Sequence, residues 1–280
     1  MSDNIGVVLG IDVGGSTTKI TGFLPDGTLL PPIFVRATDP LTSLYGALGK
    51  FTDVNDISLD DISRIMVTGV GSTYITKPLY GMQCTNVPEF RCIGLGGLYI
   101  SGLERAIVVS MGTGTAMTYT IKGEEPTYLG GTGVGGGTLS GLSKLLLGMD
   151  NISHVAELAK EGSLSKVDLT IRDITSRDRM SGLPEHMTAA NFGKVSDLAG
   201  KPDIALGIIN MVFETVGVFA VFAARNHELK DIVLTGNLTT VPQAAAIFAN
   251  MGKMFGMNFI LPENSRYGTV IGAALAGIVG

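Results

Sequence analysis

Residues Ile5–Ile20 read IGVVLGIDVGGSTTKI, and residues Arg105–Gly131 repeat the same order of features in RAIVVSMGTGTAMTYTIKGEEPTYLGG. In each segment an apolar run leads into a glycine-rich turn, and a run with several threonines follows. This order predicts two strands joined by a tight hairpin. Because the pattern occurs twice, the chain is expected to contain two related halves.

Predicted strands and helices alternate in both halves of the chain. The helix patterns include about Pro88–Leu103 and Asp203–Glu228, whereas about Ser163–Gly200 reads as an irregular polar region. The alternation predicts an α/β fold, and the hairpin that opens each half predicts mixed sheets. We expect an N-terminal lobe of residues 1–104 and a C-terminal lobe of residues 105–280.

The composition favours a small-molecule partner. The net charge is −5, the isoelectric point is about 5.2 and no basic run occurs, which argues against nucleic acid or an anionic membrane as a partner. The mean hydropathy of +0.36 is high, but the most apolar stretch carries Glu214 in its middle, which favours a buried helix over a membrane span. Because no signal-peptide pattern precedes the first strand, a cytoplasmic protein is expected.

The glycine turns have the residue types of a phosphate site. Glycines let a backbone approach an anion without an intervening Cβ, while hydroxyl and ammonium groups donate to anionic oxygens. The turn VGGST of the first half is matched by SMGTGT in the second half, and VLTGNL adds a third turn between a strand and a helix. Three such turns in this order favour phosphate binding over ordinary hairpin structure.

These features, with GIDVGGSTTK at Gly10–Lys19, resemble the superfamily of actin, the sugar kinases and Hsp70. The resemblance implies a two-lobed, duplicated, ribonuclease H-like fold in which two hairpin turns hold the phosphates of ATP in an interlobe cleft. It also implies that Asp12 meets Mg²⁺ through the water shell of the ion, and that VLTGNL lies on the adenosine side. The implied ATP-binding residues are Gly14, Gly15, Ser16, Thr17, Lys19, Thr113, Gly114, Gly236 and Asn237.

The stretch YLGGTGVGGGT at Tyr128–Thr138 passes directly into a predicted helix. A flexible linker would mix glycine with serine and charged residues, whereas a glycine-rich turn at a helix start is typical of an anion site. We expect the backbone amides of this turn to approach the nucleotide. Close packing of the helix on a sheet is a compatible alternative. The residues predicted to contact ATP here are Gly135, Gly136, Gly137 and Thr138.

Three longer motifs resemble the type II pantothenate kinases: LGGTGVGGGTLSGLSKLLLG, LTIRDITSRDRMSGLPEHMTAANFGKV and PEFRCIGLGGLYI. The similarity extends from about Val7 to Leu275. Members of this family transfer the γ-phosphoryl group of ATP to the primary hydroxyl of pantothenate, the first step towards coenzyme A, and they form dimers. The resemblance implies the same activity here, with ATP and Mg²⁺ as cofactors, a homodimer and an acyl-coenzyme A regulator.

Glu89 matches the catalytic glutamate of that family, which lies at the start of a helix. Phosphoryl transfer to an alcohol uses a group that accepts the hydroxyl proton as the oxygen attacks, and the resemblance assigns this role to Glu89. The alternative is a carboxylate in a first helical turn that stabilises the helix N-terminus. The residues alone leave both roles open.

The predicted acceptor pocket departs from the family pattern at two positions. Relatives carry an arginine before the Gly-Gly of the multi-glycine turn, where this chain has Tyr128 followed by Leu129, and a serine after GTGT, where it has Ala116. Arg91 stands where relatives tend to carry aspartate, and it either restores a positive charge or faces solvent. The residues predicted to line the acceptor pocket are Thr115, Ala116, Tyr128 and Arg91.

Three functions therefore stay open. The chain is a pantothenate kinase, a kinase for a related primary alcohol without the carboxylate, such as pantetheine, or a non-catalytic protein that binds nucleotide or acyl-coenzyme A. The third function is disfavoured because Asp12, Lys19 and Glu89 are all present. Activators of dehydratases share the first motif, but Cys84 and Cys92 do not match their iron–sulfur cysteine pattern.

Overall fold

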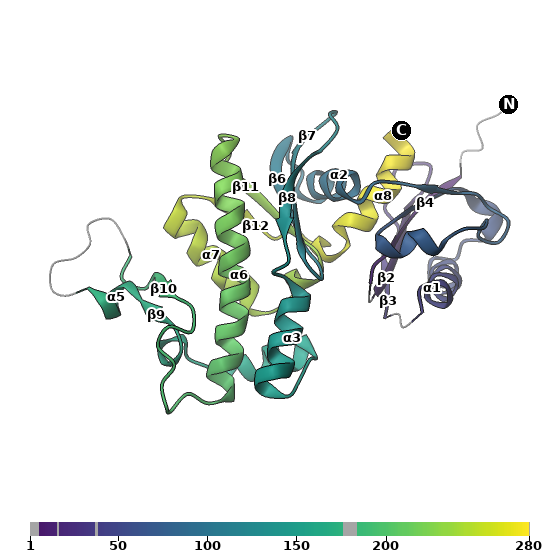
Figure 1. The fold of residues 1–280 in the computed structure, drawn as a ribbon. Helices are drawn as coiled ribbons and strands as arrows, with labels where there is room; N and C mark the ends of the chain where they lie inside the picture. Colours follow the sequence, from purple (N-terminus) through teal and green to yellow (C-terminus); the bar gives the residue numbers. More distant parts are fainter. Residues whose placement is uncertain (1–5, 16, 37–38, 176–183, 280) are drawn as a thin grey trace.

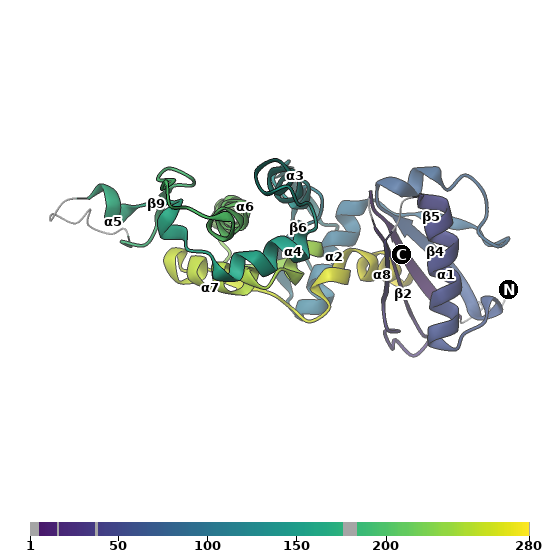
Figure 2. The same ribbon diagram turned by 90° about the horizontal axis from the view of Figure 1, so that it is seen from below.

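The computed structural model describes residues 6–15, 17–36, 39–175 and 184–279. It has two lobes, each built on a five-stranded mixed sheet with helices around it (Figures 1 and 2). The predicted α/β fold with two mixed sheets is confirmed. Residue Ser16 and residues 176–183 of the second family motif lie outside the described residues.

The N-terminal sheet has the strand order β3-β2-β1-β4-β5. Its first three strands form antiparallel neighbours, and β4 and β5 add in parallel on the other side of β1. The elements of this part are β1 (Val7–Val13), β2 (Thr17–Phe23), β3 (Ile33–Arg36), α1 (Pro40–Asn55), η1 (Leu59–Asp61), β4 (Ile62–Thr68), η2 (Val70–Tyr74), β5 (Cys84–Asn86) and α2 (Glu89–Ser101).

The C-terminal sheet repeats this topology with the order β12-β11-β6-β7-β8. Strands β6, β7 and β8 form the antiparallel part, and β11 and β12 add in parallel to β6. The strands are β6 (Arg105–Met111), β7 (Thr115–Ile121), β8 (Thr127–Thr132), β11 (Asp231–Thr235) and β12 (Asn258–Ile260). The repeat noted in the sequence is therefore also a repeat of strand order.

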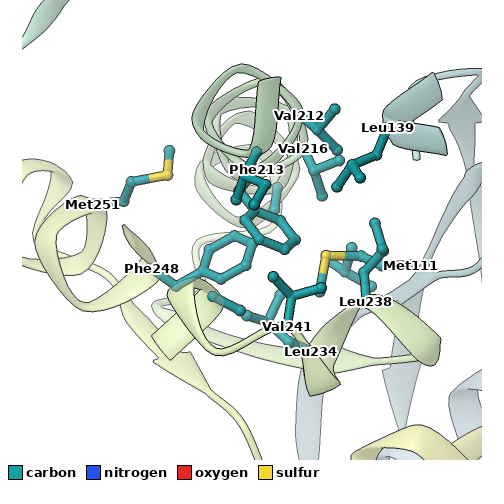
Figure 3. Packing of buried hydrophobic residues seen from close by; sticks show 14 of the residues in the cluster. Met111, Leu139, Val212, Phe213, Val216, Leu234, Leu238, Val241, Phe248 and Met251 are labelled. Atoms are coloured by element: carbon teal, nitrogen blue, oxygen red, sulfur yellow. The ribbon is translucent and has the colours of Figure 1, made fainter. Parts of the chain in front are cut away.

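The second half of the chain also contains several helical segments. They are α3 (Gly136–Leu147), α4 (Ile152–Leu158), η3 (Ala159–Glu161), η4 (Leu164–Lys166), α5 (Ile171–Ile174), α6 (Lys201–Asn226), η5 (Asn237–Thr240), α7 (Gln243–Phe255), η6 (Ser265–Tyr267) and α8 (Gly268–Val279). Helix α6 is the one described helix long and apolar enough to cross a membrane, but 61% of its most apolar window is buried in the fold. Phe213 of α6 packs against Phe248 of α7, with ring centroids 5.3 Å apart (Figure 3). This burial agrees with the predicted core helix.

The polar region before α6 contains more structure than the sequence predicts. Strands β9 (Leu169–Thr170) and β10 (Thr188–Ala190) form a small antiparallel sheet. Glu214, the acidic residue inside the apolar α6 pattern, accepts hydrogen bonds from Thr188 Oγ1 at 2.8 Å and from Asn191 Nδ2 at 2.9 Å. The TAANFG motif therefore fastens this small sheet to the core helix. Strands of two or three residues are too short for a recognisable alternation.

Helices α2 and α8 lie between the two sheets and cross each other closely (Figures 1 and 2). Helix α2 contacts β6, β7 and β11 of the C-terminal sheet, whereas α8 contacts β1, β2 and β4 of the N-terminal sheet. Each lobe thus receives a helix from the other half of the chain. The lobe boundary at residue 104 stays a prediction, and the packing of these two helices extends across it.

The crossing of α2 and α8 depends on missing side chains. A Cβ atom on Gly272 would lie 1.8 Å from the carbonyl oxygen of Cys92, and one on Gly96 would lie 1.8 Å from that of Gly268. Both obstacles are backbone atoms, which cannot rotate away as a side chain can. The two helices can pack at this distance only because glycine occupies both positions.

We expect Gly272→Ala to destabilise the protein by about 1–3 kcal/mol, because the added methyl group forces the helices apart. Gly49 on α1 is the matched control, since a Cβ there meets no atom within 4 Å. Gly49→Ala should stabilise the protein by about 0.4–1 kcal/mol through lower unfolded-chain entropy. Urea unfolding of the two variants measures both effects, and equal effects of the same sign would contradict this account of the crossing.

Candidate nucleotide and acceptor site

A cleft of about 660 Å³ opens between the lobes. Both hairpins that begin the two halves contribute to its walls. The lining residues are Asp12, Gly14, Gly15, Thr17, Lys19, Gly69, Val70, Glu89, Ser110, Gly112, Thr113, Gly114, Thr115, Ala116, Tyr128, Gly131, Thr132, Gly133, Gly236, Asn237 and Thr269. The fold thus gathers most of the predicted site residues into one cavity.

The hairpin between β1 and β2 forms the N-terminal wall of the cleft. The amide of Gly14 donates to the Thr17 carbonyl at 2.9 Å, which closes the turn, and a Cβ on Gly15 would meet no atom within 4 Å. Lys19 Nζ lies 3.5 Å from Asp12 Oδ2, and both residues are more than nine-tenths buried. A buried ammonium group paired with one carboxylate retains donors that can bind anionic oxygens.

The hairpin between β6 and β7 forms the opposite wall. The amide of Gly112 donates to the carbonyl of Gly114 at 2.9 Å, so this turn closes as the first one does. Thr115 is buried and donates its hydroxyl to the carbonyl of Val134 at 2.8 Å. That hydrogen bond ties the hairpin to the multi-glycine turn, so the Thr115 hydroxyl has a structural partner as well as a place on the cleft wall.

Two turns with the same backbone geometry end the parallel strands that reach the cleft. Gly236 follows β11 with φ 93°, and Gly69 follows β4 with φ 84°. A Cβ would lie 2.5 Å from the Met111 carbonyl oxygen at Gly236, and 2.6 Å from Asp12 Oδ1 at Gly69. Gly69 and Val70 were not singled out from the sequence. The repeated Thr-Gly pair at the strand end, in VTGV and again in LTGN, is the signal that could have revealed them.

Several other lining residues also escaped sequence reasoning. Ser110 is the second-last residue of β6, and Thr269 belongs to the first turn of α8, near the end of the chain. Gly131, Thr132 and Gly133 lie in the earlier part of the multi-glycine stretch. Their positions depend on how β8 and α8 pack, which no local motif describes.

The later part of the multi-glycine turn has a different role from the predicted one. The amides of Gly136 and Gly137 donate to the carbonyls of Gly112 and Thr113 at 2.9 and 2.8 Å, and the amide of Gly135 donates to Thr138 Oγ1 at 3.3 Å. These amides are used within the protein, so the prediction that they face the nucleotide is wrong. A Cβ on Gly135 would lie 2.8 Å from backbone atoms of the β6–β7 hairpin. Close packing of the turn against this hairpin therefore explains the glycines better than contact with a nucleotide.

Glu89 lies at the start of α2 and lines the cleft. Although solvent reaches its side chain, the surrounding protein partly buries the carboxyl and raises its pKa. The negative charge of Asp12 raises this pKa further, while Lys19 acts in the opposite direction. A carboxylate with a raised pKa is a better proton acceptor near neutral pH than an exposed glutamate.

An aromatic pair borders the cleft beside Glu89. The rings of Tyr128 and Phe90 stack with centroids 3.8 Å apart and an interplanar angle of 12°. Tyr128 and Ala116 line the cleft, as predicted for an acceptor pocket. At this border the chain therefore presents an aromatic face and a methyl group, and neither supplies a positive charge.

Arg91 does not belong to the cleft. Its side chain lines a separate cavity of about 480 Å³ between α2, α8 and the β7–β8 hairpin, and its Nε lies 3.1 Å from Glu125 Oε1. That ion pair lacks the geometry of a hydrogen bond. Two residues along a helix correspond to about 200° of rotation, so Arg91 and Glu89 point to opposite sides of α2. The prediction that Arg91 restores a positive charge in the acceptor pocket is therefore wrong.

The acidic groups of the cleft fit one mode of magnesium binding. Within the described ranges, no group of three or more His, Cys, Asp or Glu side chains could hold a metal ion. The carboxylates on the cleft wall are Asp12 and Glu89. Mg²⁺ in nucleotide sites keeps several waters and is held by one or two carboxylates together with substrate phosphates. The donor set suits a magnesium ion that arrives with ATP.

Comparison with known proteins identifies the family. The model of the family named Fumble matches residues 105–258. A type II pantothenate kinase of Oceanobacillus iheyensis is 31% identical over 228 residues, which cover 78% of this chain and 84% of the relative. The chain belongs to the type II pantothenate kinase family. Its relative in Bacillus cereus strain G9842, with the same name, is 30% identical over 82% of this chain and 83% of its own. The family is one of ATP-dependent phosphotransferases, as the sequence motifs predict.

Solved structures support the fold of this family member. Component A of the (R)-2-hydroxyglutaryl-CoA dehydratase of Acidaminococcus fermentans covers 97% of both chains with a TM-score of 0.70 and 18% identity. A ROK family glucokinase from Streptomyces griseus, solved with glucose and AMPPNP, covers 98% of this chain and 100% of its own with a TM-score of 0.62 and 10% identity. At such identities the likeness concerns the fold alone. It confirms the actin-like architecture.

Proposed function

We propose that this protein transfers the γ-phosphoryl group of ATP to the primary hydroxyl of pantothenate, a step of coenzyme A biosynthesis. The observation that carries the proposal is the position of Glu89, whose carboxylate shares one cleft with both glycine hairpins. Family membership supplies the substrate class. Retention of Asp12, Lys19 and Glu89 in this cleft weighs against a non-catalytic binding protein.

In this proposal the two hairpins hold the phosphates of ATP. Gly14, Gly15 and Gly114 give backbone access, and Lys19 supplies the positive charge. Thr17 and Thr113 contribute hydroxyl groups on the two walls. Gly236 and Asn237 border the adenosine side. Asp12 would hold a magnesium ion through water, and the ion would neutralise charge on the phosphates when bound.

Glu89 is proposed to accept the proton of the acceptor hydroxyl as the oxygen attacks the γ-phosphorus. The new bond joins that oxygen to phosphorus, the bond from phosphorus to the bridging β-phosphate oxygen breaks, and ADP leaves with the electron pair. The hydroxyl proton moves to the Glu89 carboxylate and then to solvent. Positioning and charge stabilisation by the hairpins supply most of the acceleration in such reactions.

The acid side of the pH profile provides one test of this role. We expect kcat/KM for the acceptor to fall as pH decreases through the pKa of Glu89, because only the ionised carboxylate accepts a proton. Partial burial and the charge of Asp12 raise this pKa above the ordinary value of 4.5, so the decline should begin at a correspondingly higher pH. A profile measured at saturating ATP and Mg²⁺ that stays flat down to pH 4.5 would contradict the assignment.

A second acceptor class is favoured by Tyr128. The position that carries a cation in the family pattern holds a tyrosine stacked on Phe90, and Ala116 supplies no hydroxyl. The predicted replacement cation, Arg91, points away from the cleft. Without a cation in the pocket, pantothenate has no charged partner for its carboxylate and binds more weakly. A related primary alcohol without a carboxylate, such as pantetheine, does not need that partner, so its binding free energy is less affected.

Steady-state kinetics with both acceptors tests the proposal directly. ATP and Mg²⁺ are held saturating while pantothenate and pantetheine are varied, and ADP release is measured. Turnover of either acceptor supports a kinase, and kcat/KM for pantothenate equal to or above that for pantetheine excludes the second acceptor class as the main one. Nucleotide binding without turnover of any alcohol would favour a binding protein.

The proposal also covers the oligomeric state, the compartment and the regulation of the enzyme. The homodimer and the acyl-coenzyme A regulator are what the family resemblance of the sequence motifs implies, and the cytoplasm is the compartment expected from the sequence. Light scattering after size-exclusion chromatography measures the oligomeric state. Inhibition of ATP turnover by acetyl-coenzyme A at fixed acceptor concentration tests the regulator, and unchanged turnover at saturating thioester would remove that part of the proposal.

A further inference from the structure

Arg266 forms a contact between the two lobes. It belongs to η6, just before α8, and its guanidinium carbon lies 3.6 Å above the ring centre of Phe34 on β3 of the N-terminal sheet. A guanidinium over an aromatic face at this distance is a close cation–π contact. Thus a side chain from the end of the chain rests on the N-terminal lobe.

On the N-terminal side, the contact lies next to β2, the second strand of the β1–β2 hairpin. Phe34 is the direct cross-strand partner of Lys19 in the antiparallel pair of β2 and β3. Side chains at directly opposite positions of such a pair share one face of the sheet and lie side by side. Lys19 lines the cleft and pairs with Asp12. Arg266 therefore packs on the immediate neighbour of a residue proposed to hold phosphate.

On the C-terminal side, η6 is fastened to the turn on the adenosine side of the cleft. Arg266 Nε donates to Asn237 Oδ1 at 3.4 Å, and Ser265 Oγ donates to Thr239 Oγ1 at 2.9 Å. The amide of Gly236 also donates to the carbonyl of Ser265 at 3.0 Å. These three contacts hold η6 against the Gly236–Thr240 turn.

The arginine holds this position although other forces oppose its charge. Burial of the guanidinium lowers its pKa, Tyr267 acts in the opposite direction, and the nearby charge of Arg36 lowers the pKa further. Among the ion pairs between described side chains, none compensates Arg266. The Phe34 ring and the Asn237 amide oxygen are in direct contact with the guanidinium.

We propose that Arg266 is a positioning residue that orients Asn237 for the nucleotide and couples the adenosine-side turn to the phosphate hairpin of the other lobe. The inference rests on the proposed function, because it assumes that ATP lies between Asn237 and Lys19. Arg266 does not line the cleft itself, so it acts through Asn237 and Phe34. When it is present, both walls of the nucleotide site keep one relative placement.

The test compares nucleotide affinity among full-length variants. Arg266→Lys keeps the positive charge but loses the flat guanidinium face and the Nε donor, while Phe34→Leu keeps an apolar side chain without the ring. Each variant is expected to weaken binding of a nonhydrolysable ATP analogue with Mg²⁺ by about 3-fold to 30-fold. Phe34→Tyr retains the ring and should bind like the wild type. Both substitutions remove the same contact between Arg266 and Phe34. The double variant should therefore bind the ATP analogue about as tightly as the single variant with the lower affinity.

A second arginine–phenylalanine contact in the same chain provides the matched control. Arg225 lies over the Phe255 ring at 5.8 Å, in a part of the C-terminal lobe away from the cleft. Arg225→Lys and Phe255→Leu should leave nucleotide affinity within 2-fold of the wild type. The acceptor KM should stay within 2-fold in all variants.

The inference is overturned if Arg266→Lys and Phe34→Leu bind the analogue as the wild type does, or if their losses add in the double variant. Lower thermal stability with unchanged affinity would also overturn it, since that result describes a purely structural contact. A wild-type protein that binds no nucleotide would instead overturn the proposed function, and this inference with it.

Discussion

Glu89→Gln is expected to lower kcat by about 10²- to 10⁴-fold, the usual contribution of a positioned general base. Glutamine has nearly the same shape but cannot accept the proton of the attacking hydroxyl. The nucleotide affinity should change little, because the proposed role of Glu89 concerns the acceptor hydroxyl and not the phosphates of ATP. Steady-state turnover and binding of a nonhydrolysable ATP analogue measure the two quantities separately.

Glu125→Gln is the matched control for this experiment. Glu125 is an exposed glutamate that pairs with Arg91 on the far side of α2, away from the cleft. Its replacement should leave kcat within about 2-fold, since a surface ion pair contributes little. An unchanged rate for Glu89→Gln would mean that Glu89 only stabilises the start of α2. In that case its loss should appear in unfolding measurements and not in kcat.

Tyr128→Arg is expected to raise kcat/KM for pantothenate by about 10-fold to 100-fold relative to pantetheine. The physical reason is a charged donor for the pantothenate carboxylate, a contact that contributes about 1.5–3 kcal/mol. Pantetheine has no carboxylate at that position, so its kcat/KM should not increase. Because an arginine can also stack on the Phe90 ring, the variant can keep the local packing.

Tyr128→Phe separates charge from packing in the same assay. It preserves the stack on Phe90 and adds no cation, so the ratio of the two kcat/KM values should stay as in the wild type. If Tyr128→Arg leaves the ratio unchanged as well, the carboxylate of pantothenate does not reach this border of the cleft. The acceptor would then be selected by other residues, of which Thr132 and Gly133 line the same cavity.

Much of the cleft wall could be predicted from local sequence, because hairpin turns are decided by a few adjacent residues. Gly14 and Gly114 belong to turns whose closing hydrogen bonds lie within four residues, so their motifs carry the geometry with them. The same holds for Gly236, whose positive φ strongly favours glycine. The repeated order of strand and turn also predicted the antiparallel strands of both sheets.

The predictions that proved wrong concern directions and distances set by packing. The family pattern places Arg91 in the acceptor pocket, but the helix turns it to the side of α2 opposite Glu89. The amides of Gly136 and Gly137 were expected to face the nucleotide, yet the neighbouring hairpin takes them as donors. In each case the contacting group belongs to a different helix, strand or turn. A short sequence motif carries no information about such a contact.

The sequence by itself thus determined the duplicated fold class, the two glycine hairpins and the family, because these follow from local turn chemistry and repeated patterns. Only the tertiary structure decided the stack of Tyr128 on Phe90, the crossing at Gly272 and the contact of Arg266 with Phe34. These contacts join residues between 38 and 232 positions apart or depend on helices exchanged between lobes. Close packing between distant elements sets them, and it becomes visible only when both elements are in place.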